Sequence, residues 1–168
     1  MMAAMLMVKK TDPIHIICQA CASGKTHILL SSATTIHHKS KYFGEVPFEE
    51  VLGADPYSDK VLIAVPDATL ANIYVEKLER VYGCIANNEG KGGGVQVVTH
   101  EKFLTILKTL EKEETQEFVR DAAVFIDEGD QLLKQLTATT IGLGCLKQFT
   151  RSIILLSATF TKRQRLAL

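Results

Sequence analysis

The sequence predicts an α/β fold, a three-layer α-β-α sandwich around a mostly parallel sheet. Short apolar runs rich in β-branched residues recur along the chain, and longer helical patterns follow most of them. These runs lack polar alternation, which is typical of strands that helices cover on both faces. The predicted strands are residues 14–18, 61–65, 95–99, 122–127 and 152–156.

Two helices are predicted from apolar residues that recur at helical spacing. In residues 67–81, charged side chains occupy the remaining positions, and Gly83 ends the pattern. Residues 103–110 form a second apolar face, and the charged run 111–114 is predicted to be a solvated helix surface. The apolar face of the first helix comprises Leu70, Ile73, Tyr74, Leu78 and Val81. The predicted surface loops are residues 39–60 and 87–94.

Composition bounds the class of protein. A chain of 168 residues with 46% hydrophobic residues suits one domain, 1–168. The 19 Lys and Arg balance 19 Asp and Glu, so any hold on a nucleic acid depends on local patches. Four scattered cysteines favour an intracellular protein, cytoplasmic or nuclear, over a disulfide framework. No apolar run is long enough to span a bilayer, so we expect no membrane contact, and we expect a monomer.

A candidate phosphate loop follows the first predicted strand. Residues 19–24 form a turn, and a helix is predicted to begin at Lys25. Small residues let backbone N–H groups face a phosphate, and the helix directs the positive end of its dipole at it. Lys25 is predicted to contact the β- and γ-phosphates, and the Thr26 hydroxyl a Mg²⁺ ion. The predicted nucleotide-binding residues are Ala22, Ser23, Gly24, Lys25 and Thr26.

Three carboxylates, Asp127, Glu128 and Asp130, stand at the end of the fourth predicted strand. A buried parallel strand carries them to its carboxyl end, beside the candidate phosphate loop. Asp127 is predicted to hold Mg²⁺, and Glu128 to orient or deprotonate the attacking water. The catalytic candidates are therefore Glu128 and Lys25. A solvated helix start, with favourable charges near its N-terminus, is the alternative interpretation.

The last predicted strand leads into Ser157, Ala158 and Thr159. The hydroxyls of Ser157 and Thr159 could hydrogen-bond Asp130 or the γ-phosphate end and so couple the site to hydrolysis. The tripeptide carries little information by itself, because a second copy, residues 32–34, lies within the first predicted helix. Packing is the expected role of that copy.

In this order, the motifs resemble the first RecA-like domain of a superfamily 2 helicase of the DEAD-box (DExD/H) type, a P-loop NTPase. The resemblance covers nearly the whole chain: the phosphate loop matches motif I, residues 127–130 match motif II and residues 157–159 match motif III. Residues 61–71 and 97–103 resemble motifs Ia and Ib. The resemblance implies an ATP hydrolase that binds Mg-ATP and couples hydrolysis to unwinding or remodelling of RNA or DNA.

The resemblance also implies that Pro66 and Thr99 contact the sugar-phosphate backbone of a nucleic acid. The chain departs from the family near Pro66, because Asp67 follows it and the family's backbone-contacting arginine is absent, which adds repulsive charge. Gln19 occupies a position where the family usually has glycine or alanine, and Ala22 occupies a position where it commonly has glycine.

A second RecA-like domain, which supplies an arginine finger in this family, is missing from the sequence. We therefore expect this domain to bind ATP but to hydrolyse it weakly or not at all. Two alternatives stay open. A P-loop ATPase of another purpose, such as a protein-translocating motor, agrees with the neutral charge and Asp67, whereas a non-hydrolysing nucleotide-binding module agrees with Gln19 and Ala22.

Overall fold

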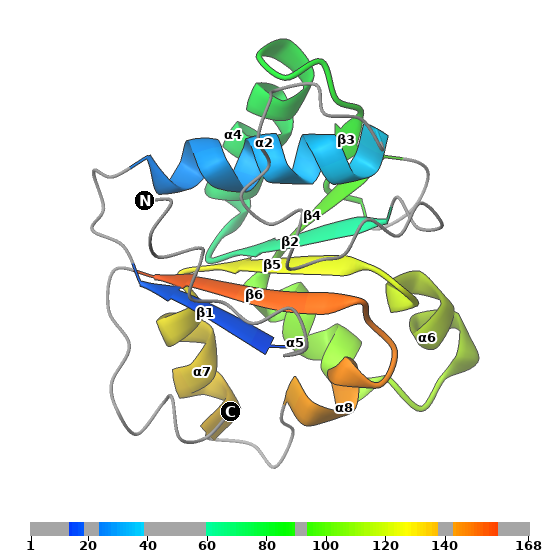
Figure 1. The fold of residues 1–168 in the computed structure, drawn as a ribbon. Coiled ribbons are helices and arrows are strands. Elements are labelled where there is room, and N and C mark those ends of the chain that lie inside the picture. Colours follow the sequence, from blue (N-terminus) through cyan, green and yellow to red (C-terminus); the bar gives the residue numbers. More distant parts are fainter. Residues whose placement is uncertain (1–13, 19–23, 39–59, 90–93, 138–142, 158–168) are drawn as a thin grey trace.

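A single parallel sheet organises the chain. The structure, a computed structural model, describes residues 14–18, 24–38, 60–89, 94–137 and 143–157. Within these residues, six strands form one sheet in the order β1-β6-β5-β2-β4-β3, and every neighbouring pair is parallel (Figure 1). The expected α/β sandwich is confirmed, with a sheet that is parallel throughout its described strands.

The elements alternate along the chain as the apolar runs predict. The strands are β1 (Ile14–Cys18), β2 (Val61–Val65), β3 (Ala86–Asn87), β4 (Val95–Thr99), β5 (Ala123–Asp127) and β6 (Ser152–Ser157). The helices are α2 (Lys25–His38), α4 (Ala68–Arg80), α5 (His100–Lys108), α6 (Glu113–Val119), α7 (Gly129–Thr137) and α8 (Leu143–Lys147). All five predicted strands are present; β5 begins one residue later than predicted and β6 ends one residue later.

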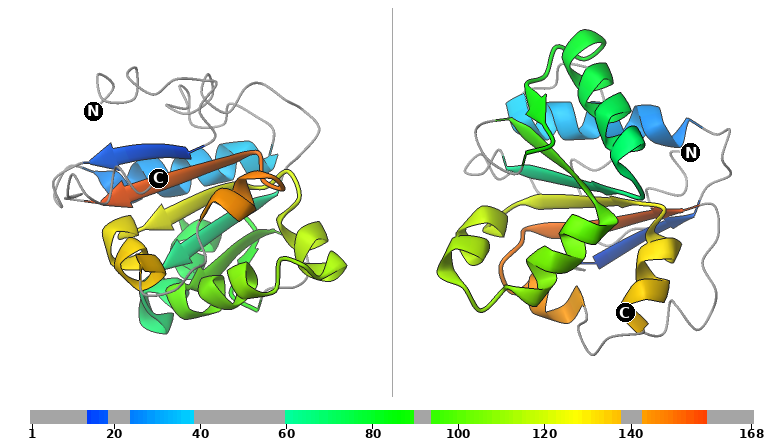
Figure 2. Two further views of the ribbon diagram at one scale, coloured as in Figure 1. Left: turned by 90° about the horizontal axis from the view of Figure 1, so that it is seen from below. Right: turned by 180° about the vertical axis from the view of Figure 1, so that it is seen from behind.

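Helices cover both faces of the sheet (Figure 2). One apolar cluster joins α2 and α4 to the sheet, and a second joins α5, α6, α7 and α8 to the opposite face. Along β5, Phe125 belongs to the first cluster, whereas Val124 and Ile126 belong to the second. This burial on two sides explains why the strands show no polar alternation in the sequence.

The apolar face of α4 is narrower than the sequence predicts. Ala71, Tyr74 and Leu78 are its buried residues, a spacing that keeps them on one stripe of the helix. Ile73 is 42% exposed and Val81 is 68% exposed, so their expected place in the apolar face is wrong. Ile73 follows Asn72 on the side turned away from this stripe, and Val81 is the C-cap residue, beyond the last helical residue.

The glycine-rich stretch contains one short strand that the sequence analysis missed. β3 pairs with β4 at the edge of the sheet, so Asn87 belongs to a strand and not to a surface loop. Gly94 precedes β4 with φ +93°, and a Cβ there would lie 2.4 Å from the Ile85 carbonyl oxygen. Only glycine fits this close approach. Residues 90–93, and residues 39–59 of the predicted loop 39–60, lie outside the described part of the chain.

The second predicted helix is present as α5, which begins three residues before the predicted start and ends two residues before the predicted end, and the charged run is exposed as predicted. Phe103, Ile106 and Leu107 are buried on α5, and the four residues 111–114 are all exposed. The run ends a turn and begins α6 at Glu113, so only its second half is helical. Among the described helices, none combines the length and the apolar character that crossing a membrane requires.

Candidate active site

The strand order brings the two predicted motifs to one edge of the sheet. Only β6 separates β1 from β5, and the paired positions Cys18 with Ser157 and Leu156 with Asp127 show that all three strands end at one level. Because neighbouring strands lie about 4.8 Å apart, the ends of β1 and β5 are roughly 10 Å apart. A long side chain from the start of α2 can cross that distance.

Lys25 makes this crossing. It is the first residue of α2, and its Nζ lies 3.1 Å from Asp127 Oδ1 and 3.0 Å from Glu128 Oε1. Burial alone would lower the pKa of the Lys25 ammonium, but the two neighbouring carboxylates outweigh burial and raise this pKa above its ordinary value. Lys25 therefore remains charged, and it holds the two acids together.

Asp127 is buried, and each of its carboxylate oxygens accepts at least one hydrogen bond. Strand alternation turns its side chain toward the face that α2 and α4 cover, the face that also takes Phe125. Its Oδ1 accepts the Glu128 N–H at 3.0 Å as well as Lys25, and its Oδ2 accepts the Tyr74 hydroxyl at 2.5 Å. Its backbone carbonyl accepts the His100 Nε2–H at 2.8 Å. The orientation of this carboxylate is thus fixed from several sides.

Tyr74 links Asp127 to Thr26. Tyr74 is 3% exposed, and its hydroxyl donates to Asp127 Oδ2 and lies close to the Thr26 side chain. Burial, followed by the charge of Asp127, raises the pKa of the Tyr74 hydroxyl above its ordinary value, so it keeps its proton and acts as a donor. Thr26, the predicted magnesium ligand of α2, therefore lies beside the predicted magnesium ligand of β5.

Glu128 occupies the turn between β5 and α7. Its φ is +50°, in the left-handed region that residues other than glycine seldom adopt. This conformation ends β5 abruptly and places the Glu128 side chain, 30% exposed, next to Lys25 rather than along the strand. Asp127 is 3% exposed, so it does not belong to a solvated helix start, although Asp130 does lie in the first turn of α7.

Ser157 and Asp130 form a second polar contact at the same edge. Ser157 ends β6 on the face that α7 covers, and its Oγ donates to Asp130 Oδ1 at 2.6 Å. The contact is the one that the sequence analysis expects for Ser157. The other predicted residues Ala22, Ser23 and Thr159 lie outside the described residues, as do Gln19 and Cys21. Gly24 is described, exposed and in the left-handed region, with φ +82°.

The residues predicted to meet a nucleic acid lie at the ends of β2 and β4. Thr99 is the N-cap of α5, where its hydroxyl accepts the Lys102 N–H at 3.1 Å. Asp67 is the N-cap of α4 and accepts the Leu70 N–H at 2.8 Å, directly after the half-buried Pro66. Both side chains therefore have local structural roles, which satisfy free N–H groups at helix starts. Contact with a nucleic acid stays a prediction.

Sequence reasoning missed two residues of the site. The sequence predicts Tyr74 only as part of the apolar face of a helix and gives no site role to His100, yet both bind Asp127. A buried tyrosine has a hydroxyl that needs a hydrogen-bond partner. A histidine just after the end of one strand lies near the ends of the neighbouring strands. These signals indicate a polar contact, but not which of the acids provides it.

The donor set suits magnesium in the presence of a phosphate ligand. Magnesium is commonly held by one or two carboxylates together with substrate phosphates, rather than by a cage of protein ligands. Thr26 and Asp127 offer one hydroxyl and one carboxylate, which Tyr74 brings together. Across the described ranges, no group of three or more His, Cys, Asp and Glu side chains is arranged to hold a metal ion. Thr26, Asp127 and a phosphate together fit the requirement.

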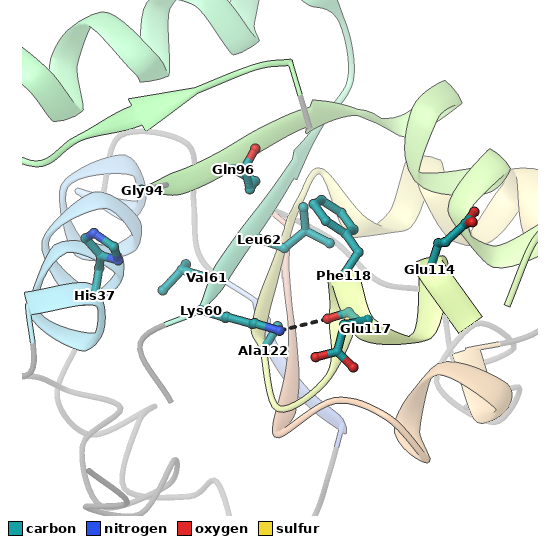
Figure 3. Close-up of a pocket in the computed structure, with 10 residues that line it drawn as sticks. All are labelled: His37, Lys60, Val61, Leu62, Gly94, Gln96, Glu114, Glu117, Phe118 and Ala122. Carbon is teal, nitrogen blue, oxygen red and sulfur yellow. Dashed lines mark hydrogen bonds between the residues drawn. The ribbon is translucent and has the colours of Figure 1, made fainter. Parts of the chain in front are cut away.

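A cavity of about 510 Å³ lies at the opposite end of the strands (Figure 3). Its lining includes Val61 at the start of β2, Gln96 near the start of β4, and Ala122 just before β5. Lys60 closes one side by donating from Nζ to the Glu117 carbonyl at 2.7 Å. The cavity is therefore separate from the Lys25 cluster, which lies where the strands end.

No protein-family model matches the chain, and no curated protein matches it either. A functional assignment therefore depends on the geometry of the side chains at the carboxyl edge of the sheet.

Proposed function

We propose that this chain binds Mg-ATP at the carboxyl edge of its sheet and acts as the ATP-binding domain of a helicase-type motor. The observation that carries the proposal is the convergence of Lys25 Nζ on Asp127 and Glu128, at 3.1 and 3.0 Å. Lys25 and Glu128 are 103 positions apart in the sequence. They meet because the parallel sheet places both segments at the same edge.

The charges at this edge favour a nucleotide together with a divalent cation. Two carboxylates and one ammonium leave a net negative charge, which alone would repel a triphosphate. Lys25 can turn from the carboxylates to the β- and γ-phosphates while its backbone stays in the first turn of α2. A bound Mg²⁺ ion supplies positive charge to the phosphate oxygens. Thr26 and Asp127 would hold this ion.

Asp127 and Glu128 differ in exposure, and this difference assigns their roles. Asp127 is buried and accepts a hydrogen bond from Tyr74, which lies beside Thr26. This position suits metal binding. Glu128 is 30% exposed, so water can reach its carboxylate. It is therefore the residue to orient or deprotonate the water that attacks the γ-phosphate.

The helicase part of the proposal is supported by the contact between Ser157 and Asp130. It connects the end of β6 to the start of α7, directly after the Asp127–Glu128 pair, so a change at the pair can be transmitted to β6. Pro66 follows β2 and Thr99 ends β4, and these two strands continue the same sheet beyond β5. We propose that a single strand of nucleic acid passes over these strand ends, beside the nucleotide.

Linked binding tests this proposal. We expect that single-stranded RNA or DNA raises the affinity for Mg-ATP by roughly 5–150-fold, the usual range of coupling, and that Mg-ATP raises nucleic-acid affinity equally. Fluorescence titrations with both ligands measure this. Absence of coupling with both RNA and DNA contradicts the helicase assignment. ATP turnover stimulated by an unfolded polypeptide instead would support a protein-translocating motor, and binding without turnover under all conditions a non-hydrolysing module.

A further inference from the structure

We propose that Tyr74 is a positioning residue for the magnesium-dependent part of nucleotide binding, an inference that rests on the proposed function. Its hydroxyl donates to Asp127 Oδ2 and lies close to the Thr26 side chain, so it stands beside both residues assigned to the ion. Tyr74 belongs to α4, which contributes neither the phosphate loop nor the acidic pair. A third segment of the chain therefore sets the geometry of the site.

The direction of the hydrogen bond between Tyr74 and Asp127 follows from the number of protons. The Tyr74 hydroxyl has one proton, and it donates this proton to the Asp127 carboxylate, which can only accept. Lys25 and the Glu128 N–H contact the other carboxylate oxygen, Oδ1, so Tyr74 holds the Oδ2 side of the residue assigned to the metal ion.

Tyr74 also holds Asp127 after Lys25 has moved. In the structure, Asp127 Oδ1 accepts both Lys25 Nζ and the Glu128 N–H, and Oδ2 accepts Tyr74. When Lys25 turns to the phosphates, its contact with the carboxylate is lost. The Glu128 N–H and the Tyr74 hydroxyl then hold one oxygen each, so the plane of the carboxylate stays fixed.

Water cannot easily take the place of the tyrosine hydroxyl. Tyr74 is 3% exposed and belongs to the apolar cluster between α2, α4 and the sheet, together with Leu29, Leu30 and Leu78. Removal of the hydroxyl oxygen from this packed position leaves Asp127 Oδ2 without the Tyr74 donor. Residues that orient metal ligands in this way typically change metal affinity by about 10–100-fold when they are lost.

Tyr74→Phe tests the proposal, because phenylalanine keeps the ring in the apolar cluster. The probe is Mg²⁺ itself, titrated against a fixed concentration of a fluorescent ATP analogue, with a second nucleotide titration in EDTA. We expect the Mg²⁺ concentration at half-saturation to rise by about tenfold, at the lower end of the range above. Nucleotide affinity in EDTA should be unchanged, because Lys25 and the phosphate loop are intact.

Tyr82→Phe is the matched control. Tyr82 is 8% exposed, belongs to the same apolar cluster and bonds His27 Nδ1 through its hydroxyl at 2.6 Å, but it does not touch the acids. The Tyr82→Phe variant should have the same Mg²⁺ concentration at half-saturation as the unmodified protein. Thermal unfolding of both variants confirms that the rings stay packed.

The outcomes separate the two proposals. If the unmodified protein binds ATP with Mg²⁺ but Tyr74→Phe has an unchanged or lower Mg²⁺ midpoint, the role of Tyr74 is overturned and the proposed function stands. An equal loss of affinity with Mg²⁺ and in EDTA also overturns it, because a general structural effect would then explain the result. If the unmodified protein binds no ATP, the proposed function fails, and the role of Tyr74 fails with it.

Discussion

Glu128 and Asp127 are adjacent in sequence but differ in environment, and the difference is the basis of a test at the level of single residues. Glu128→Gln keeps the size and shape of the side chain but removes its ability to take a proton from water. We expect Mg-ATP affinity to be retained and ATP hydrolysis to fall by roughly 10²–10⁴-fold, the contribution of a positioned general base.

Phosphate release in single-turnover and steady-state assays measures this loss. Glu79→Gln, at an exposed position of α4, is the control and should hydrolyse ATP at the unmodified rate. Retained hydrolysis in Glu128→Gln would show that another group activates the water.

His100 predicts a dependence of stability on pH. It is 2% exposed, and burial lowers the pKa of its imidazole, although the Asp127 carbonyl and the charges of Asp127, Glu128 and Asp130 act in the opposite direction. The unfolded chain therefore binds a proton at this residue more readily than the folded chain. The stability contributed by neutral His100 is complete above the unfolded pKa of about 6.5, and it is lost as the pH falls below that value.

Urea unfolding at several pH values between 7 and 5 tests this dependence. We expect the free energy of unfolding to fall toward acid more steeply in the unmodified protein than in His100→Gln, by up to about 1.4 kcal/mol per pH unit. Glutamine can donate a hydrogen bond to the same carbonyl but does not titrate, and the remaining histidines are common to both proteins. Equal slopes would mean that His100 charges as easily in the folded state as in the unfolded one.

Single residues also show how far the sequence can predict the site. The meeting of Lys25, Asp127 and Glu128 could be predicted because each lies at or after the end of a strand within a recognisable pattern, and parallel strands end at one edge. Tyr74 and His100 could not. Their contacts with Asp127 depend on the rotation of α4 and α5 against the sheet, which is set by packing and is not encoded in local spacing.

At the level of elements, the starts of α4 and α5 follow one rule. Both helices begin directly after a strand, and the residue before each helix accepts a backbone N–H with its side chain, Asp67 for α4 and Thr99 for α5. A polar cap residue just before the apolar pattern of a helix is readable from sequence. For α4 this gives Asp67 a structural role, in addition to any effect of its charge on a nucleic acid.

Asp67 variants separate the cap from the charge. Asp67→Ala should lower the free energy of unfolding by about 1 kcal/mol, because the Leu70 N–H loses its acceptor. Asp67→Asn should retain most of this stability, because the asparagine carbonyl can accept the same bond without charge. Chemical denaturation of the three proteins measures the difference. Equal stability of the alanine variant and the unmodified protein would show that the cap contributes nothing.

The elements themselves could be predicted to different degrees. The five long strands were readable because continuous apolar runs are typical of strands buried on both faces. β3 was not, because two residues in a glycine-rich stretch form a strand only through pairing with β4. The prediction for Ile73 was wrong because helical spacing alone allows several different sets of apolar residues on α4 to be buried. Contact with the sheet buries Ala71, Tyr74 and Leu78.

At the level of the whole molecule, the strand order explains why Lys25 and the two acids meet at one edge. Placing β6 between β1 and β5 leaves the ends of β1 and β5 roughly 10 Å apart. The Lys25 side chain spans this distance to reach Asp127. The cavity drawn in Figure 3 lies at the other end of the strands, and its lining residues do not include Lys25, Asp127 or Glu128.

If the edge binds a nucleotide, the whole fold should gain stability from it. A ligand present at about 100 times its dissociation constant stabilises the folded state by roughly 2.7 kcal/mol. We therefore expect a rise in the unfolding temperature with Mg-ATP, and a much smaller rise with ATP in EDTA. Differential scanning fluorimetry measures both. An equal rise in the two conditions would contradict the requirement for a divalent cation.

The central claim is that Lys25 belongs to a binding site for the phosphates of Mg-ATP. Calorimetric titration of Mg-ATP into the unmodified protein, Lys25→Ala and Lys60→Ala tests it most directly. Lys60 is the control because its Nζ bonds the Glu117 carbonyl at the opposite end of the strands. Loss of a charge-assisted contact to phosphate should weaken binding in Lys25→Ala by about ten- to a hundredfold, whereas Lys60→Ala should bind as the unmodified protein does. Unchanged affinity in a folded Lys25→Ala protein would contradict the account.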